Sequence, residues 1–200
     1  MRLFRRGAGA GDRWLVAGLG NPGSQYARNR HNAGALALEE LAARIGVSFK
    51  RHKSGCFVDE GELAGERVVL ARPISYMNES GRPLRALATY YKIDAGRIVV
   101  LHDEIDIPFG EVRIKFGGGT AGHNGLKSIV AHLGTQDFIR VRIGVSRPRG
   151  DQGATGHVLG DFSASERAEL PVMLDRVADA VERILEVGID GAMNEVNTRK

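Results

Sequence analysis

The part of the chain that decides its fold is WLVAGLGNPGSQYARNRHN, at residues 14–32. It begins with an apolar run at 14–17 without polar alternation, which predicts a strand covered on both faces. A glycine-rich turn follows, and apolar residues at helical spacing then predict a helix at 31–45 that ends at Gly46. We interpret the polar residues further along the chain as completing a functional site at this turn.

The glycines of this turn, Gly18, Gly20 and Gly23, follow the G-x-G-x-x-G pattern of dinucleotide-binding sites. In that pattern the helix begins directly at the last glycine, so that its N–H groups meet the pyrophosphate. Here residues 24–30 separate the turn from the helix, Pro22 removes a backbone donor, and no acidic residue ends the next strand. These features disfavour a nucleotide-dependent oxidoreductase, which a binding titration with NAD would test.

The composition is that of one globular domain, with 200 residues of which 42% are hydrophobic and 26% charged. A single cysteine, Cys56, excludes an internal disulfide and fits a reducing compartment. No run reaches the ~18 apolar residues of a membrane span, so we expect a cytoplasmic protein. Residues 1–13 are expected to be a disordered extension before a single domain at 14–200. The net charge of +4 permits a nucleic-acid partner without requiring one.

The other elements are predicted from apolar periodicity and turn residues. Arg140 and Arg142 alternate with apolar residues on a strand, so their side chains are predicted to point outward. Ser163 and Glu166 form a capping box at the start of a long helix. The segment 148–156 is expected to be a mobile linker. Strands are predicted at 48–53, 56–63, 67–72, 98–101, 111–116 and 138–145, and helices at 84–91, 126–133, 163–187 and 190–197.

Polar residues gather where apolar runs end. His31 begins the first helix, Asn21 precedes it in the turn, and Asp103 follows the 98–101 strand within His-Asp-Glu. Ionisable groups at a strand end are costly to desolvate without a purpose. A metal site would need a second cluster of ligands, which the sequence does not offer. We therefore favour an Asp103 carboxylate that orients His31 as a general base, although His31 taken alone could be a surface histidine.

The glycine-rich segment at 117–125 nearly matches a phosphate-binding P-loop. His123 and Asn124 stand where that motif has Lys and Ser or Thr, so an NTPase is disfavoured. What remains is a loop that lets a ligand approach the backbone closely, with His and Asn donors beside it.

Three residues that follow the 67–72 strand, Tyr76, Met77 and Asn78, lie where open α/β sheets bind ligands, although core packing and a turn explain them equally well. The chain has no G-x-S-x-G nucleophile elbow. A His–Asp pair with amides suggests that water attacks a carbonyl directly, with an Asn N–H₂ group at the oxyanion. Lys115 and other outward basic groups could bind phosphates or only contact water.

Four motifs, GLGNPGSQYARNRHNAG, SYMNESG, HDEID and GGGTAGHNGLKS, resemble those of the bacterial peptidyl-tRNA hydrolases in order and spacing. The resemblance covers about residue 14 to the C-terminus. It implies a single α/β domain with a twisted mixed β-sheet flanked by helices on both faces, working as a monomer without a cofactor or a metal. The implied reaction is hydrolysis of the ester that joins a peptide to the terminal ribose of tRNA, which releases tRNA for recycling.

The resemblance also implies roles for single residues. His31 matches the catalytic base, Asp103 the acid that keeps it basic, and Asn21 the residue that helps to tell N-blocked from free aminoacyl groups. Lys115 and Arg142 match positions thought to hold the tRNA 5′-phosphate. Contacts to the tRNA acceptor end are implied for Tyr26, Tyr76, Asn78 and Asn124, and Met77 and His123 line the same cleft.

The sequence departs from the family pattern at Asn29, where threonine is frequent, and at Tyr76, where phenylalanine is common. The extra hydroxyl of Tyr76 would alter stacking on the terminal base rather than the chemistry. A non-catalytic RNA-binding module stays open as an alternative, because it would share the basic strands but would not need His31 and Asp103 together.

Overall fold

The computed structural model describes residues 13–148 and 153–198. Seven strands in this part of the chain form one mixed sheet in the order β2-β3-β4-β1-β5-β7-β6. β1 pairs in parallel with β4 and β5, and β5 with β7, whereas the pairs β2·β3, β3·β4 and β6·β7 are antiparallel. The strands are β1 (Arg13–Gly18), β2 (Lys50–Arg51), β3 (Cys56–Leu63), β4 (Glu66–Pro73), β5 (Ile98–Glu104), β6 (Val112–Phe116) and β7 (Ile139–Gly144).

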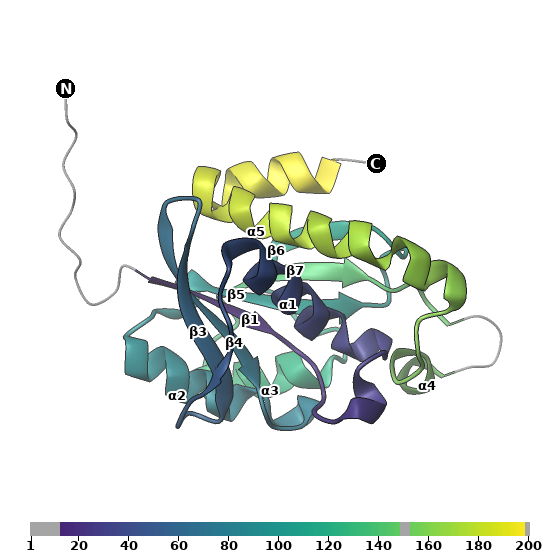
Figure 1. Cartoon of the computed structure of the whole chain (residues 1–200), viewed down its shortest axis with the longest axis horizontal. Helices are drawn as coiled ribbons and strands as arrows, with labels where there is room; N and C mark the ends of the chain where they lie inside the picture. Colours follow the sequence, from purple (N-terminus) through teal and green to yellow (C-terminus); the bar gives the residue numbers. More distant parts are fainter. Residues whose placement is uncertain (1–12, 149–152, 199–200) are drawn as a thin grey trace.

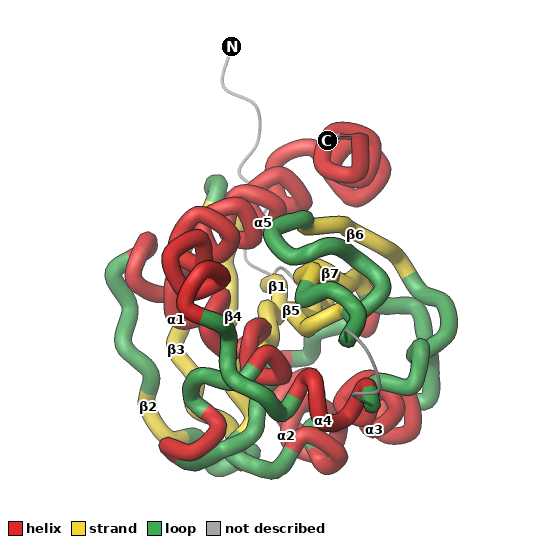
Figure 2. The backbone as a smooth tube through the Cα atoms, turned by 90° about the vertical axis from the view of Figure 1, so that its right-hand side faces the viewer, coloured by secondary structure: helices red, strands yellow, loops and turns green. Residues whose placement is uncertain are grey.

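Helices cover both faces of the sheet, which confirms the predicted fold class (Figure 1). α1 (Ala33–Ile45) and α5 (Ala164–Thr198) pack on one face, and α2 (Gly81–Tyr91) and α3 (Asn124–Leu133) on the other. Figure 2 shows the two helix layers on opposite sides of the carboxyl ends of β1, β5 and β7. The short helix α4 (Ala154–Val158) lies at this end of the sheet.

The first strand is buried on both sides, as its unbroken apolar run predicts. Val16 packs into the core on the α1 and α5 face, whereas Leu15 and Ala17 pack into the core on the α2 and α3 face. Gly18 is needed for packing, because a Cβ there would lie 2.5 Å from the carbonyl oxygen of Gly34 in α1. The first glycine of the G-x-G-x-x-G pattern thus serves the contact between strand and helix.

The helix ends follow the predicted signals. Gly46 ends α1 in the left-handed conformation, with φ 70°. In the capping box, the Ser163 N–H donates to Glu166 and the Glu166 N–H donates back to the Ser163 hydroxyl. Gly188, with φ 77°, interrupts α5 between its long and short parts, as predicted.

Several predicted boundaries are wrong. The 48–53 strand contains only two paired residues, and Arg13 belongs to β1 rather than to the N-terminal extension, whose residues 1–12 lie outside the described residues. β5 continues to Glu104 because its last residues pair with β7. The 148–156 linker includes the start of α4, and its residues 149–152 are not described. The burial of His157, whose Nε2–H donates to the Val145 carbonyl, fixes this helix against the sheet.

The outward orientation predicted for Arg140 is also wrong, because the residue is only 2% exposed. The face of β7 on which it lies is covered by the glycine-rich loop, and its guanidinium donates to the carbonyls of Gly118 and Gly119. Strand alternation places a side chain on a face without indicating whether a loop covers that face.

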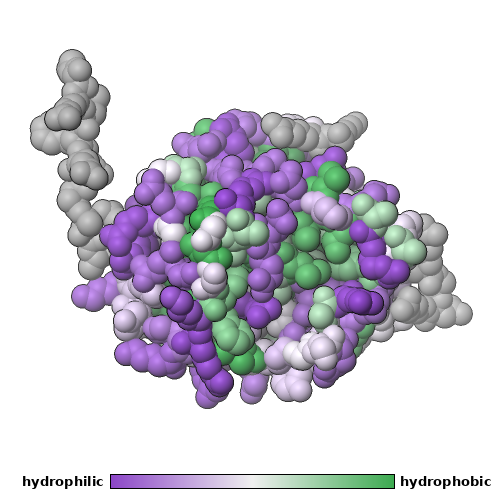
Figure 3. Space-filling model, in the orientation of Figure 1, coloured by the Kyte–Doolittle hydropathy of each residue, from purple (hydrophilic) through white to green (hydrophobic). Residues whose placement is uncertain are grey.

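The surface is mostly polar in the view of Figure 3, with apolar residues exposed near the centre and toward the right. No helix within 13–148 and 153–198 is long and apolar enough to cross a membrane.

Candidate active site

A cavity of about 400 Å³ opens at the carboxyl ends of β1 and β5. Loops after β1 and β4, the glycine-rich loop before α3, and α4 complete its wall. The structure brings together eight of the residues singled out from the sequence, and these are Asn21, His31, Tyr76, Met77, Asn78, Asp103, His123 and Asn124.

Asp103 is the centre of the polar cluster in this cavity. One of its oxygens, Oδ1, lies 2.9 Å from His31 Nδ1 and 3.0 Å from His123 Nε2. Burial alone would raise the pKa of the Asp103 carboxyl, but the charge and hydrogen bonds of His123 and His31 outweigh it and hold this pKa well below its usual range. The carboxylate is therefore ionised and can only accept hydrogen bonds.

The hydrogen bonds of His123 fix where its proton lies. His123 is the N-cap of α3, and its Nδ1 accepts from the backbone N–H groups of Gly125 and Leu126. Nε2 must then carry the proton that it donates to Asp103. This pattern was not predicted from the sequence, where His123 was assigned only as a donor beside the glycine-rich loop and as part of the cleft lining.

His31 lies in a short 3-10 turn, η2 (Arg30–Asn32), directly before α1. Its Nδ1–H must be the donor to Asp103, because the ionised carboxylate has no proton to give. Nε2 is consequently unprotonated in the neutral ring and free to accept a proton. The His31 side chain is 11% exposed and lines the cavity, so a ligand or water in the cavity can reach it.

Asn21 is held in place by two other residues of the loops. The Asn32 side chain accepts from the Asn21 backbone N–H at 2.9 Å and donates to its carbonyl at 3.0 Å. The Asn21 Oδ1 accepts from the Met77 backbone N–H at 2.8 Å. Since Oδ1 is engaged, the N–H₂ group of Asn21 is the part of the amide left for a ligand. The role of Asn32 in holding this loop was not predicted from the sequence.

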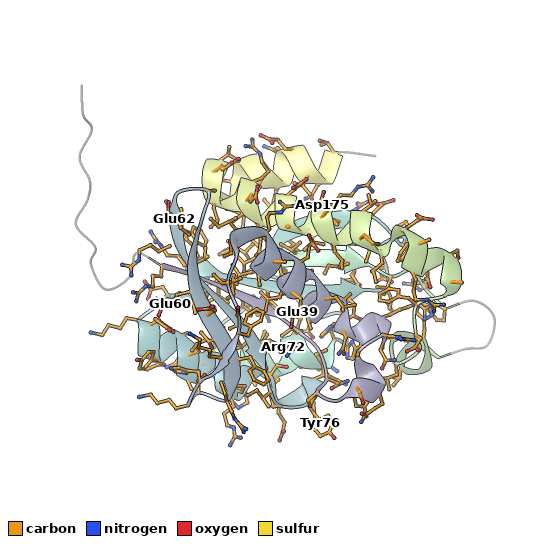
Figure 4. The ribbon with its side chains drawn as sticks, in the orientation of Figure 1. Glu39, Glu60, Glu62, Arg72, Tyr76 and Asp175 are labelled. Atoms are coloured by element: carbon orange, nitrogen blue, oxygen red, sulfur yellow. The ribbon has the colours of Figure 1, made fainter. Side chains whose placement is uncertain are left out.

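Aromatic rings form one rim of the cavity. Tyr76 is 54% exposed and projects from the lower edge of the protein in Figure 4. Tyr26 does not line the cavity but packs edge-on against Tyr76, with ring centroids 6.5 Å apart. Such a pair offers an aromatic face next to the polar cluster.

The two predicted phosphate-binding residues lie outside the cavity, on β6 and β7. Lys115 is exposed and has no acidic partner among the described residues. The Arg142 guanidinium instead donates to Glu104 Oε2 at 3.0 and 3.1 Å. Glu104 lines the cavity, and its position in the ionisable run that ends β5 was the signal that could have identified it. Nothing in the sequence indicated that Ile105 and the apolar residues of α4 would line the cavity.

Three of these groups, His31, Asp103 and His123, have ligand atoms within 4.8 Å of one another and could in principle hold a metal ion. In the hydrogen-bond pattern above, however, both histidine nitrogens that face Asp103 carry protons. A metal would need lone pairs at those atoms. The pattern therefore favours an oriented base over a metal centre.

His102 lies behind this cluster and is 1% exposed. Its Nδ1–H donates to the Asp103 carbonyl at 2.7 Å, and its Nε2 has no partner among the described residues. Burial, followed by the charge of His123, lowers the pKa of His102 to about 3. The ring is therefore neutral in the folded protein at any pH near neutrality.

This burial predicts an acid-dependent loss of stability. As pH falls below the ordinary histidine pKa of about 6.5, His102 becomes protonated in the unfolded chain but stays neutral in the folded protein. The free energy of unfolding should fall by about 1.4 kcal/mol per pH unit from this group, or about 2 kcal/mol between pH 6.5 and 5. Urea denaturation of wild type and His102→Asn at pH 7 and pH 5 should show a smaller drop in the variant. Equal drops would contradict the assignment.

The fold and this cavity define a class of protein. An α/β sheet presents, at its strand ends, a carboxylate-oriented histidine with a free nitrogen beside amide donors. None of the described residues that line the cavity is a serine or a cysteine. These features are typical of a hydrolase.

Comparison with known proteins identifies the family. The chain matches the peptidyl-tRNA hydrolase family over residues 15–200. It is 54% identical over 181 residues to the peptidyl-tRNA hydrolase of Frankia alni, covering 90% of this chain and 92% of that protein. The corresponding protein of Arthrobacter sp. is 51% identical over 189 residues, covering 94% and 97%. The chain belongs to the peptidyl-tRNA hydrolase family and is a hydrolase of peptidyl-tRNA.

The fold agrees with this assignment. A crystal structure of peptidyl-tRNA hydrolase from Acinetobacter baumannii is similar to this chain with a TM-score of 0.88 and 37% sequence identity. The similarity covers 97% of this chain and 99% of that one. The whole sheet and its helices are thus shared, rather than the cavity alone.

Proposed function

We propose that the chain cleaves the ester between the peptide and the terminal ribose of peptidyl-tRNA by direct attack of water, with His31 as the general base. The observation that carries this proposal is the hydrogen bond from His31 Nδ1 to Asp103, which leaves Nε2 free toward the cavity. An Asp-oriented imidazole with one free nitrogen can take a proton from water as the oxygen attacks.

The reaction then has two proton transfers. Water adds to the ester carbonyl while His31 Nε2 takes one of its protons, and the ionised Asp103 stabilises the imidazolium. The tetrahedral intermediate collapses by breaking the bond to the ribose oxygen, which receives the proton from His31. The products are a peptide carboxylic acid, which ionises, and tRNA with a free terminal hydroxyl. This sequence uses no cofactor.

The oxyanion of the intermediate needs a donor that already points into the cavity. The N–H₂ group of Asn21 meets this requirement, because Met77 engages the amide oxygen and Asn32 holds the backbone. A donor fixed in this way stabilises developing charge without reorganisation. Asn78 and Asn124, whose amides make no hydrogen bond with described residues, are left to bind the tRNA end or the peptide.

The remaining contacts position the tRNA. The aromatic rim of Tyr26 and Tyr76 would stack on the terminal base, and Lys115 with Arg142 would approach the 5′-phosphate. All of these groups come from one chain, so the site is complete in a monomer. We place the reaction in the cytoplasm, in one catalytic domain that begins with β1 at Arg13.

The function is tested with a tRNA that carries either an N-acetylated or a free aminoacyl group. We expect cleavage of the N-acetylated form and much slower cleavage of the free form. The acetylated α-nitrogen resembles the peptide bond of peptidyl-tRNA, whereas a protonated α-amino group does not. Binding of both forms without cleavage of either would instead indicate a non-catalytic RNA-binding module.

Replacing Lys115 with alanine should raise KM with little change in kcat, because a phosphate contact positions the substrate but does not take part in the chemistry. The dependence of KM on salt should also become shallower by about one released counterion. Lys50→Ala is the matched control, because Lys50 is exposed on β2 at the opposite edge of the sheet. An unchanged KM in Lys115→Ala would contradict the phosphate contact.

A further inference from the structure

Arg140 is an arginine buried behind the glycine-rich loop. Its guanidinium donates through NH1 to the Gly119 carbonyl and through NH2 to the Gly118 carbonyl, both at 2.5 Å. It also lies over the ring of Phe138, at 4.7 Å from the centroid. On the paired strands, Arg140 stands directly opposite Lys115.

This arrangement is costly for folding alone. A buried cation loses its hydration, and Arg140 forms no ion pair within 4 Å of a described carboxylate, so only the more distant charge of Glu104 offsets part of that loss. Its Nε–H has no partner among the described residues. A second cation, Arg142, lies two residues further along the same strand and adds repulsion. An apolar residue of similar volume would avoid these costs, so the guanidinium is expected to have a role in the site.

The loop itself depends on Arg140. Gly117, Gly118, Ala121 and Gly122 all have positive φ, between 47° and 87°, so the loop has no regular pattern of hydrogen bonds. Residues 118–122 donate no backbone N–H to any described acceptor. By binding the carbonyls of Gly118 and Gly119, Arg140 holds two successive peptide groups of this segment in place.

The orientation of those peptides has a consequence for ligands. In a trans peptide the carbonyl and the following N–H point in opposite directions, and the described chain has no cis peptide. The N–H groups of Gly119 and Thr120 therefore point away from Arg140. Lys115 lies against the same loop, since a Cβ on Gly118 would be 2.9 Å from its Nζ. Backbone N–H groups of a loop that an ammonium contacts can bind a phosphate.

We propose that Arg140 is a positioning residue that holds the 117–122 loop, so that its unpaired N–H groups and the Lys115 ammonium bind the 5′-phosphate of the tRNA together. This inference rests on the proposed function, because it assumes that Lys115 meets that phosphate. Arg140 acts from behind the loop and does not touch the substrate.

The test compares N-acetylated aminoacyl-tRNA that carries a 5′-phosphate with the same tRNA after phosphatase treatment. For wild type we expect a lower KM with the phosphate. In Arg140→Met the ratio of the two KM values should fall about tenfold, the effect of losing one hydrogen bond to a charged group. Arg140→Lys, which keeps the charge but cannot bind two carbonyls in the same way, should lie between.

Arg176→Met is the matched control, because the Arg176 guanidinium also donates to a glycine carbonyl, that of Gly110, but at an exposed position on α5. Its KM ratio should equal that of wild type. Thermal melts establish which variants fold, and Arg140→Lys carries the test if Arg140→Met does not. Arg140→Lys and Lys115→Ala combined should lose less than the sum of the single effects.

The outcomes separate this inference from the proposed function. Failure of wild type to cleave the N-acetylated substrate would overturn the proposed function. Cleavage with an intact phosphate preference in a folded Arg140 variant would overturn only the role of Arg140. A uniform loss on both substrates would also overturn it, since the arginine would then support the fold in general. Equal KM values for the two substrates in wild type would contradict the proposed 5′-phosphate site itself.

Discussion

Replacing His31 with alanine should lower kcat by about 10²- to 10⁴-fold, the usual effect of losing a general base. The substitution removes Nε2, the cavity-facing nitrogen that the hydrogen bond to Asp103 leaves free. Binding of tRNA should be nearly unchanged, because the proposed tRNA contacts lie on other elements. Single-turnover hydrolysis and a binding titration, performed side by side, measure the two effects.

The matched control is His52→Ala, which removes a histidine from the segment between β2 and β3, outside the cavity. Its turnover should equal that of wild type. Parallel loss of turnover and tRNA binding in His31→Ala would mean that His31 supports the structure of the site, and the role of base would have to be given up.

Replacing Asp103 with asparagine should have the second largest effect. The carboxylate accepts N–H groups from both His31 and His123 at one oxygen, so it fixes the protonated nitrogen of each ring. An amide can turn its N–H₂ group toward these rings and so favour the tautomer of His31 that has a proton on Nε2. We expect kcat to fall by about 10²-fold or more.

The same substitution should change the pH dependence. The ionised carboxylate stabilises the protonated imidazole, so its loss should move the acid limb of the rate profile to lower pH. Asp94→Asn, at an exposed position, is the control and should leave the profile in place. An unchanged limb in Asp103→Asn would show that Asp103 does not act on His31.

The sequence was most informative where local signals and packing agree. The apolar run at 14–17 predicted a strand buried on both faces, and β1 has this property. Gly46 and the capping box at Ser163 predicted helix ends because glycine adopts the left-handed conformation easily and Ser and Glu side chains satisfy free N–H groups. These signals act within a few residues, so they can be interpreted without knowledge of the rest of the fold.

Other features depend on contacts between distant segments. Arg140 was predicted to point outward, but the covering loop has positive φ at several residues, and its path is fixed by the arginine itself. The pairing of His31 with Asp103 was predicted from their chemistry and is seen at 2.9 Å. The second hydrogen bond, from His123, depends on how that residue caps α3. The sequence pattern does not indicate the orientation of the His123 ring.

The central claim is that His31 accepts the proton of the attacking water. The most direct test is the pH dependence of the single-turnover rate for N-acetylated aminoacyl-tRNA, measured for wild type and His31→Ala. The account predicts that the wild-type rate rises with pH along one limb to a plateau, and that His31→Ala loses this limb and increases only with hydroxide concentration. A slow variant that kept the wild-type limb would show that another group is the base.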